Sequence, residues 1–155
     1  MKIFLFGISF ILIVAALIVF PDLLSELAEV AKLSYAASTL SDVNVEAQLK
    51  KLDQLMKQAQ MYQNENLNLS MVAEAMELTP HQLSELVNVQ FGMNFSRYIR
   101  GQRIDAAKLQ LANEPNSSVL AIGLEVGFKS QSNFYAAFKE ITDLSPGSYR
   151  KSLHE

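Results

Sequence analysis

The side chains of this chain that could do chemistry lie in two short polar segments, 81–88 and 131–136. Both segments are rich in amides and hydroxyls, which donate and accept hydrogen bonds, and the first also holds a carboxylate, which only accepts. The chemistry they offer is hydrogen bonding at a surface. The candidate residues are His81, Gln82, Ser84, Glu85 and Asn88 in the first segment and Gln131, Ser132, Asn133, Tyr135 and Ala136 in the second.

Catalytic and metal chemistry find little support in the sequence. The chain has no Cys, which excludes disulfides, thiolate zinc sites and cysteine nucleophiles. Its two histidines, His81 and His154, have no ligand partners at metal-binding spacing, and no Gly-rich phosphate loop occurs. Serines in the turns are placed to cap helices. We therefore expect no enzyme activity, no metal and no cofactor.

An internal repeat positions the two polar segments. An offset of 50 aligns Val72 with Ile122 and Met76 with Val126, and an offset of 51 then aligns Leu83 with Phe134. The same offset continues with Val87 on Phe138, Met93 on Leu144 and Tyr98 on Tyr149. Two supersecondary units with one apolar template are implied.

Each copy has the pattern of a helix, a tight turn and a second helix. Thr79, Pro80 and Gln82 form a capping box after the first turn, while Gly127 and Ser130 serve the second turn. We expect these helix-turn-helix units at 69–92 and 118–142. The inward positions are Val72, Ala73, Met76, Leu83, Leu86 and Val87 in the first unit and Val119, Ile122, Val126, Phe134, Ala137, Phe138 and Ile141 in the second.

Other helices complete an all-α fold without a credible strand. Apolar spacing predicts a helix from Val45 to Ala59 with a short coiled-coil-like seam, which either packs on its own domain or pairs two chains. A polar loop is expected at 62–68. Asn94 begins a helix to about Ala112, with Phe95, Tyr98, Ile99 and Leu109 on its buried side, and Ser145-Pro146 begins a closing helix through Tyr149.

Two helices, one in each helix-turn-helix unit, have outward polar faces. This repetition favours a DNA-binding surface over an ordinary solvated one. In a major groove, amides suit adenine, a carboxylate accepts from cytosine, and apolar surface meets the thymine methyl. The connecting helix of about 28 Å is compatible with adjacent grooves about 34 Å apart. The candidate phosphate contacts are Arg97, Arg100, Arg103, Lys129, Lys139 and Arg150. Arg103 has an alternative interpretation, an internal ion pair with Glu or Asp.

The charge balance of the chain argues against DNA binding. The chain has 13 Lys and Arg against 16 Asp and Glu, a net charge of −3. From Leu67 to Glu155 the count is 8 basic against 9 acidic residues. Phosphate neutralisation supplies most non-specific DNA affinity. We therefore expect weak DNA binding that depends on a few arginines and amides.

The residues resemble the AraC/XylS-type transcription regulators. The second unit, VLAIGLEVGFKSQSNFYAAFKEITDLSPGSYRK at 119–151, follows the family's Ile-Ala helix, Val-Gly-Phe turn, Phe/Tyr-x-x-x-Phe-Lys helix and terminal Ser-Pro-x-x-Tyr-Arg. The first unit, at 69–104, is also similar to the family pattern. The resemblance covers roughly 47–152 and implies a bipartite DNA-binding domain at 47–155. It implies double-stranded DNA as the partner and is compatible with a homodimer and with contact to RNA polymerase in a bacterial cell.

Three positions depart from the family pattern. Glu77 stands where the first turn usually has Gly, Gly123 where the helix usually has Ala, and Asp143 where Gly usually precedes Leu-Ser-Pro. A left-handed non-Gly residue and a helical Gly each cost about 1 kcal/mol. Together they predict a marginally stable or relaxed domain.

The N-terminal segment predicts a membrane anchor. Ile3–Phe20 is an uncharged run of 18 residues, about 27 Å long as a helix and close to the thickness of a hydrocarbon core. A secretory signal peptide and a buried core helix are the alternatives. The expected organisation is an anchor at 1–21 and a juxtamembrane helix and linker at 22–46. The family's usual sensory domain is missing, which leaves a truncated or mis-started multi-span product as another interpretation.

Orientation of such an anchor is poorly determined. Lys2 and the α-amino group weakly favour an inside N-terminus, against Lys32 on the other side. DNA binding requires the opposite, with the domain at 47–155 in the cytoplasm and the chain crossing the inner membrane once. The two hypotheses for function are a membrane-anchored, sequence-specific transcription regulator and a helical protein-interaction module with little DNA affinity.

Overall fold

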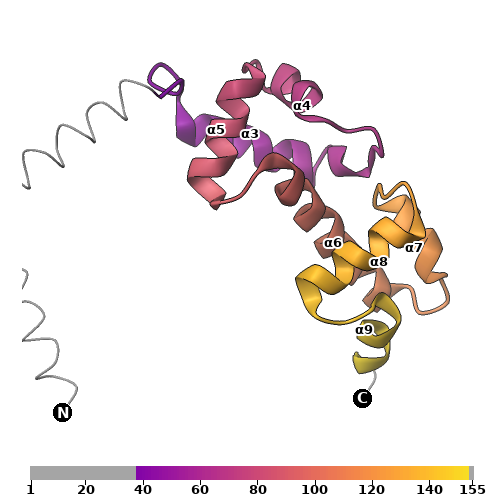
Figure 1. Cartoon of the computed structure of the whole chain (residues 1–155). Helices are drawn as coiled ribbons and strands as arrows, with labels where there is room; N and C mark the ends of the chain where they lie inside the picture. The colour runs from indigo at the N-terminus through magenta and orange to yellow at the C-terminus, as the bar shows by residue number, and fades with distance from the viewer. Residues whose placement is uncertain (1–37, 154–155) are drawn as a thin grey trace, which may run out of the picture. The chain divides into compact units, whose positions relative to one another are not determined.

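A computed structural model describes residues 38–153, of which 42–153 belong to one compact unit (Figure 1). Every regular element in this described range is helical, which confirms the predicted all-α fold. One 3₁₀ turn, η1 (Met61–Gln63), accompanies the α-helices. These are α3 (Val45–Lys57), α4 (Leu69–Met76), α5 (Pro80–Phe91), α6 (Phe95–Asn113), α7 (Val119–Glu125), α8 (Gln131–Thr142) and α9 (Pro146–Ser152).

Side-chain caps set where the helices begin. Each of the seven α-helices within 38–153 starts after an Asn, Ser or Thr whose side-chain oxygen accepts a backbone N–H, the bond that an N-cap residue provides. The expected capping box is present: Thr79 Oγ1 accepts from the Gln82 N–H at 3.2 Å, and the Thr79 N–H donates to Gln82 Oε1 at 2.9 Å. The caps are Asn44, Asn68, Thr79, Asn94, Ser118, Ser130 and Ser145.

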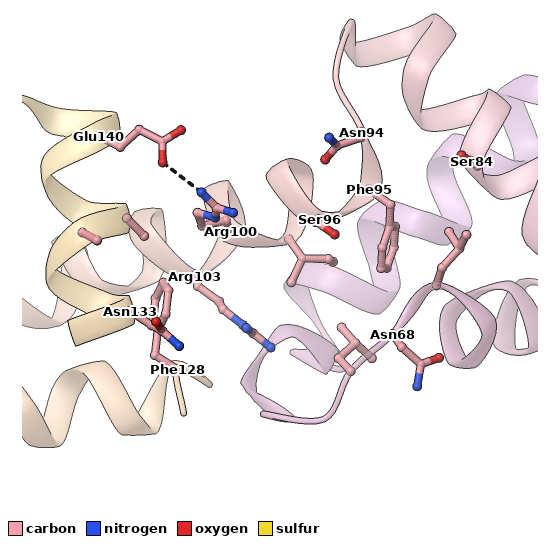
Figure 2. A pocket seen from close by; sticks show the side chains of 15 residues that line it. Asn68, Ser84, Asn94, Phe95, Ser96, Arg100, Arg103, Phe128, Asn133 and Glu140 are labelled. Carbon is pink, nitrogen blue, oxygen red and sulfur yellow. Dashed lines mark hydrogen bonds and ion pairs between the residues drawn. The ribbon is translucent and has the colours of Figure 1, made fainter. Parts of the chain in front are cut away.

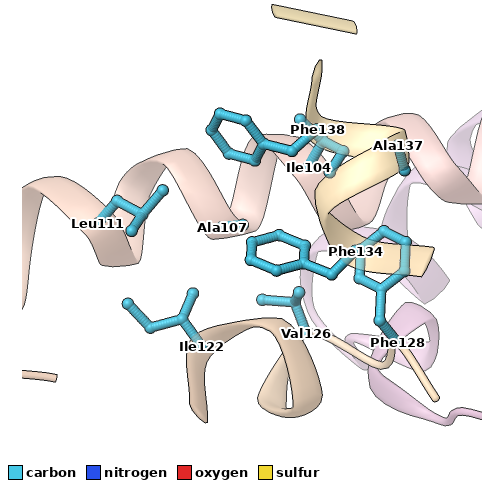
Figure 3. Close-up of a cluster of buried hydrophobic side chains, with 9 residues drawn as sticks. All are labelled: Ile104, Ala107, Leu111, Ile122, Val126, Phe128, Phe134, Ala137 and Phe138. Carbon is cyan, nitrogen blue, oxygen red and sulfur yellow. The ribbon is translucent and has the colours of Figure 1, made fainter. Parts of the chain in front are cut away.

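The internal repeat corresponds to two helix-turn-helix cores. Val72, Met76, Leu83 and Val87 are fully buried in α4 and α5. Their repeat partners Ile122, Val126, Phe134 and Phe138 are fully buried in α7, at its C-cap and in α8. In the second core the Phe134 ring packs against those of both Phe128 and Phe138 (Figure 3), with its centroid 5.3 Å from that of Phe128 and 5.7 Å from that of Phe138.

Helix α6 belongs to both cores. Its first half buries Phe95, Tyr98 and Ile99, and its second half buries Ile104, Ala107 and Leu111 in the second core. The Tyr98 ring lies 4.9 Å from that of Phe91. Burial, with a smaller contribution from the charge of Asp53, raises the pKa of Tyr98 to about 12, so the phenol stays protonated at neutral pH. A single helix thus joins the two helix-turn-helix units.

Four details of the sequence prediction are wrong. Leu109 is 66% exposed, because the buried face of α6 passes through positions 104, 107 and 111. Ile141 is 39% exposed, because the last turn of α8 extends beyond the core. The helix expected to reach Ala59 ends at Lys57. The expected polar loop begins with the 3₁₀ turn η1, which buries Tyr62.

The turns use left-handed backbone at the expected places. Glu77, Asp143 and Gly127 have φ values of 59°, 62° and 97°. The Glu77 carboxylate accepts a hydrogen bond from Lys51 Nζ at 2.8 Å, and this interaction holds the pKa of Glu77 below its ordinary value. Two departures from the family pattern therefore adopt the glycine-like conformation that their positions require.

Gly123 has a packing role in addition to its low helix propensity. A Cβ built on Gly123 would lie 2.5 Å from Cδ1 of Phe134, so the aromatic ring occupies the space that an alanine methyl would need. The expectation that this glycine merely lowers stability is therefore incomplete. Gly123 allows α7 and the Phe134 ring of α8 to approach closely.

No helix within residues 38–153 is long and apolar enough to cross a membrane. The run at 3–20, the predicted juxtamembrane helix that follows it, and His154 lie outside the described residues.

Candidate nucleic-acid interface

A cleft of about 690 Å³ lies between the two helix-turn-helix units (Figure 2). Helix α5 contributes Ser84 to its wall, and α8 contributes Asn133 and Ala136 from the opposite side. The N-terminal half of α6 contributes Arg100 and Arg103. The cleft therefore brings together five of the predicted site residues, drawn from both polar segments and from the connecting helix.

The first polar face lies on α5. His81 and Asn88 are exposed, whereas Gln82, Ser84 and Glu85 are half-buried. Gln82 has a local role as well, because its Oε1 accepts hydrogen bonds from both the backbone N–H and the hydroxyl of Thr79. Only Ser84 of this set lines the cleft.

The second polar face lies on α8. Gln131, Ser132, Asn133 and Ala136 are exposed, as a surface that meets a partner requires. Tyr135 is half-buried and packs against the second core. Its ring stands edge-on to Phe134 at a centroid distance of 5.9 Å. Tyr135 thus supports the helix and offers only part of its surface.

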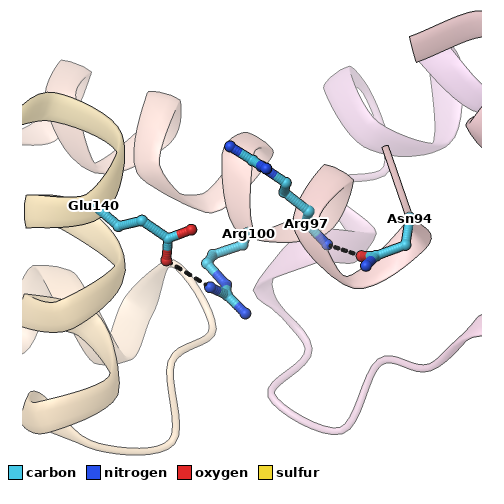
Figure 4. A network of polar contacts seen from close by, with 4 residues as sticks. All are labelled: Asn94, Arg97, Arg100 and Glu140. Carbon is cyan, nitrogen blue, oxygen red and sulfur yellow. Dashed lines mark hydrogen bonds and ion pairs between the residues drawn. The ribbon is translucent and has the colours of Figure 1, made fainter. Parts of the chain in front are cut away.

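Arg97 and Arg100 lie one turn apart at the start of α6 but differ in their partners (Figure 4). Within the described part of the chain, the Arg97 side chain makes no ion pair, and only its backbone N–H is bonded, to Asn94 Oδ1 at 2.9 Å. Arg100 crosses the cleft, where its Nη1 lies 2.8 Å from Oε2 of Glu140 on α8. This ion pair joins the connecting helix to the second polar face.

Arg103 is held by main-chain oxygens. Its Nε donates to the Tyr62 carbonyl at 2.8 Å and its Nη2 donates to the Asn64 carbonyl at 2.9 Å. The guanidinium carbon lies 5.7 Å from the centre of the Phe128 ring. Burial lowers the pKa of Arg103, although an arginine remains charged in proteins. The internal partner of Arg103 is therefore a pair of carbonyls, where the sequence suggested a carboxylate.

The other predicted cations differ in exposure. Lys129 and Lys139 are exposed and form no ion pair with any described residue. Arg150 instead donates from Nη1 to the Pro115 carbonyl at 3.4 Å, and its Nε and Nη2 are buried. The two lysines thus present charge at the surface, while the Arg150 guanidinium lies against the loop before α7.

The sequence prediction missed four polar residues of the cleft wall. Asn68, Asn94 and Ser96 line the first side, and Glu140 lines the second. The two asparagines are helix caps, so their positions next to helix starts were the available signal. Glu140 lies four residues after Ala136 and seven after Asn133, a spacing that places all three on one face of a helix.

A family model described as "Helix-turn-helix domain" matches residues 72–152, just over half of the 155-residue chain. The chain belongs to this helix-turn-helix family. The matched residues begin within α4 and include α5, α6, α7, α8 and α9.

Individual relatives of this helix-turn-helix domain are named as transcriptional regulators or as an operon regulatory protein. The arabinose operon regulatory protein of Escherichia coli is 33% identical over 90 residues, covering 58% of this chain and 30% of that protein. An AraC-type regulator structure from Chromobacterium violaceum has a TM-score of 0.60 at 24% identity and covers 72% of this chain and 98% of that one.

A third similar protein is the C-terminal domain of the two-component response regulator yesN from Fusobacterium nucleatum. Its TM-score is 0.54 at 28% identity, with 59% of this chain and 88% of that chain covered. Among the curated relatives the match spans a small part of the whole protein, for example 11%, 28% and 30% of three of them. The region that this chain shares with these relatives is the helix-turn-helix domain.

Proposed function

We propose that this chain is a sequence-specific transcription regulator that inserts α5 and α8 into adjacent major grooves of double-stranded DNA. The observation that carries the proposal is the common cleft, onto which Ser84 of α5 and Asn133 and Ala136 of α8 both face. Because both helices line the same cleft, their exposed faces can contact one side of a duplex together.

Helix α6 supports this arrangement by its length. Its 19 residues span about 28 Å, against about 34 Å between successive major grooves on one face of B-DNA. Because each half of α6 is buried in a different core, the helix fixes the separation of α5 and α8. A rigid spacing lets one chain read two half-sites.

Base reading is assigned to exposed amides, and phosphate contact to exposed cations. Gln131 and Asn133 suit adenine, and Glu85 can accept from cytosine. Arg97, Lys129 and Lys139 are the side chains that reach phosphates without first losing an ion pair within the described residues. With so few cations, we expect a modest salt dependence of binding.

Substitution of the α8 amides tests the proposal. Duplexes are first selected from a random-sequence pool at low salt, and binding is then measured by mobility shift. We expect Gln131→Ala and Asn133→Ala each to weaken binding by about 5- to 150-fold, since a good base contact is worth about 1–3 kcal/mol. Discrimination at the contacted base pair should relax in the same variants.

The matched control is Gln54→Ala, which removes an exposed amide from α3, away from the cleft. Its affinity should equal that of the unaltered chain. If the pool yields no enriched duplex, the DNA-binding proposal is wrong. The near-balance of 8 basic and 9 acidic residues from Leu67 onward would then favour the alternative, a helical protein-interaction module.

The proposal includes a single-pass anchor in the inner membrane at residues 3–20, with 47–155 in the cytoplasm. Its support is the uncharged run of 18 residues, close to the roughly 20 residues that span a hydrocarbon core. An anchored regulator would sample only DNA near the envelope. A homodimer would add affinity that the few cations do not supply.

A reporter of membrane topology fused after Glu155 tests the anchor. We expect a cytoplasmic signal and recovery of the fusion in the membrane fraction. The control lacks residues 1–21 and should move to the soluble fraction with the same cytoplasmic signal. A periplasmic signal from the full chain would contradict DNA binding by the anchored protein.

A further inference from the structure

The cleft between the two helix-turn-helix units is lined by three charged side chains, Arg100, Arg103 and Glu140. Arg103 donates two hydrogen bonds to main-chain carbonyls, so its guanidinium is fixed at the cleft wall. Among the described residues, the Arg100 side chain is bound only through its ion pair with Glu140, and both members are partly open to solvent. Arg100 is therefore the cleft cation that can change partners.

Glu140 is positioned to compete with other hydrogen-bond acceptors for Arg100. It lies on the same face of α8 as Asn133 and Ala136, and its Oε2 is 2.8 Å from Arg100 Nη1 (Figure 4). The two residues are 40 positions apart in the sequence, so the pair forms only when α8 is packed on α6. An exposed pair of this kind contributes little to stability. A phosphate, which accepts the same guanidinium bonds, can replace the carboxylate.

We propose that Glu140 competes with the DNA backbone for Arg100. In the free protein the carboxylate holds the guanidinium across the cleft. When a duplex lies on α5 and α8, the backbone between the two grooves crosses the cleft, and a phosphate displaces Glu140 from Arg100. The inference rests on the proposed DNA-binding function and assigns a positioning residue within that site.

The exchange has a consequence for overall DNA affinity. Each complex gains the Arg100–phosphate contact but loses the Arg100–Glu140 pair and gains a free carboxylate near DNA. The net gain from this contact is small on any sequence, so non-specific binding is suppressed. Sites that also offer base contacts to α5 and α8 keep their full advantage. Because the exchange is the same on every sequence, Glu140 lowers specific and non-specific affinity by one factor and leaves their ratio to the base contacts.

A double-mutant cycle separates this role from simple charge repulsion. Binding of a selected duplex is measured by fluorescence anisotropy for the unaltered chain, Glu140→Gln, Arg100→Gln and the double variant. We expect Glu140→Gln to tighten binding about two- to fivefold, the value of an exposed ion pair. In the Arg100→Gln background the same change should give a smaller gain, because only the repulsion between the Glu140 carboxylate and DNA is then relieved.

Glu125→Gln is the matched control, because it removes one exposed negative charge on α7 outside the cleft. It corrects for the general effect of net charge. The inference is overturned if Glu140→Gln tightens binding equally in both backgrounds, has no more effect than Glu125→Gln, or weakens binding. Failure of the unaltered chain to bind any selected duplex would instead refute the proposed function itself.

Discussion

Gly127→Ala is expected to lower the free energy of unfolding by about 3 kcal/mol or more, from overpacking and from left-handed strain. An alanine Cβ at this position would lie 2.4 Å from the Tyr62 carbonyl oxygen, 2.9 Å from that of Gln63 and 3.0 Å from Arg103 Nε. The backbone φ of 97° adds strain for any residue with a Cβ. Since two of the three neighbours are main-chain atoms, they cannot move aside cheaply.

Arg103 makes position 127 sensitive to substitution. Its Nε donates to the same Tyr62 carbonyl that the new methyl group would strike, so the turn of the second unit, the η1 turn and α6 meet at one point. Urea unfolding followed by circular dichroism measures the loss. We expect Gly101→Ala, the control in the middle of α6 with no atom within 4 Å of its Cβ, to raise stability by about 0.5–1 kcal/mol. Equal effects of the two substitutions would contradict the packing argument.

Gly123→Ala is expected to destabilise the domain by about 1–3 kcal/mol, although alanine is the better helix former by about 1 kcal/mol. The added methyl would lie 2.5 Å from Cδ1 and 2.8 Å from Cγ of Phe134. Phe134 is fully buried and is surrounded by three other aromatic rings, so it has little room to yield. The steric cost therefore exceeds the gain in helix propensity.

The Phe134→Leu background distinguishes this clash from a general weakness of α7. Leucine lacks the ring atoms that the methyl would meet, so Gly123→Ala should cost less there, with a coupling energy of at least about 1 kcal/mol by thermal unfolding. Strictly additive effects of the two substitutions would show that the ring is not the obstacle.

The repeat made the two cores predictable from the sequence. Because Val72 and Ile122, or Leu83 and Phe134, occupy equivalent positions at fixed offsets, burial predicted for one copy supported burial in the other. Capping was equally local: Thr79, Asn94 and Ser130 each act on a backbone N–H three residues away. Features encoded within one turn of helix, or twice in the chain, could be predicted.

Features that depend on contacts between distant segments could not be predicted from the sequence. Arg103 reaches the carbonyl of Tyr62, 41 residues away, and no residue type signals a backbone acceptor. Glu140 reaches Arg100 only because α8 packs on α6. Leu109 and Ile141 are apolar yet exposed, since the edge of a core depends on neighbouring elements. The polar faces of α5 and α8 were predicted, but the cleft that unites them was not.

The burial of α6 in two cores also restricts how the chain can change in length. Adding one residue near Gly101 would turn everything after it by about 100° around the helix axis. Either Ile104, Ala107 and Leu111 would leave the second core, or that whole core would rotate away from α5. Insertions and deletions should therefore accumulate in the loops before α4 and α7, while the number of residues in α6 stays constant through evolution.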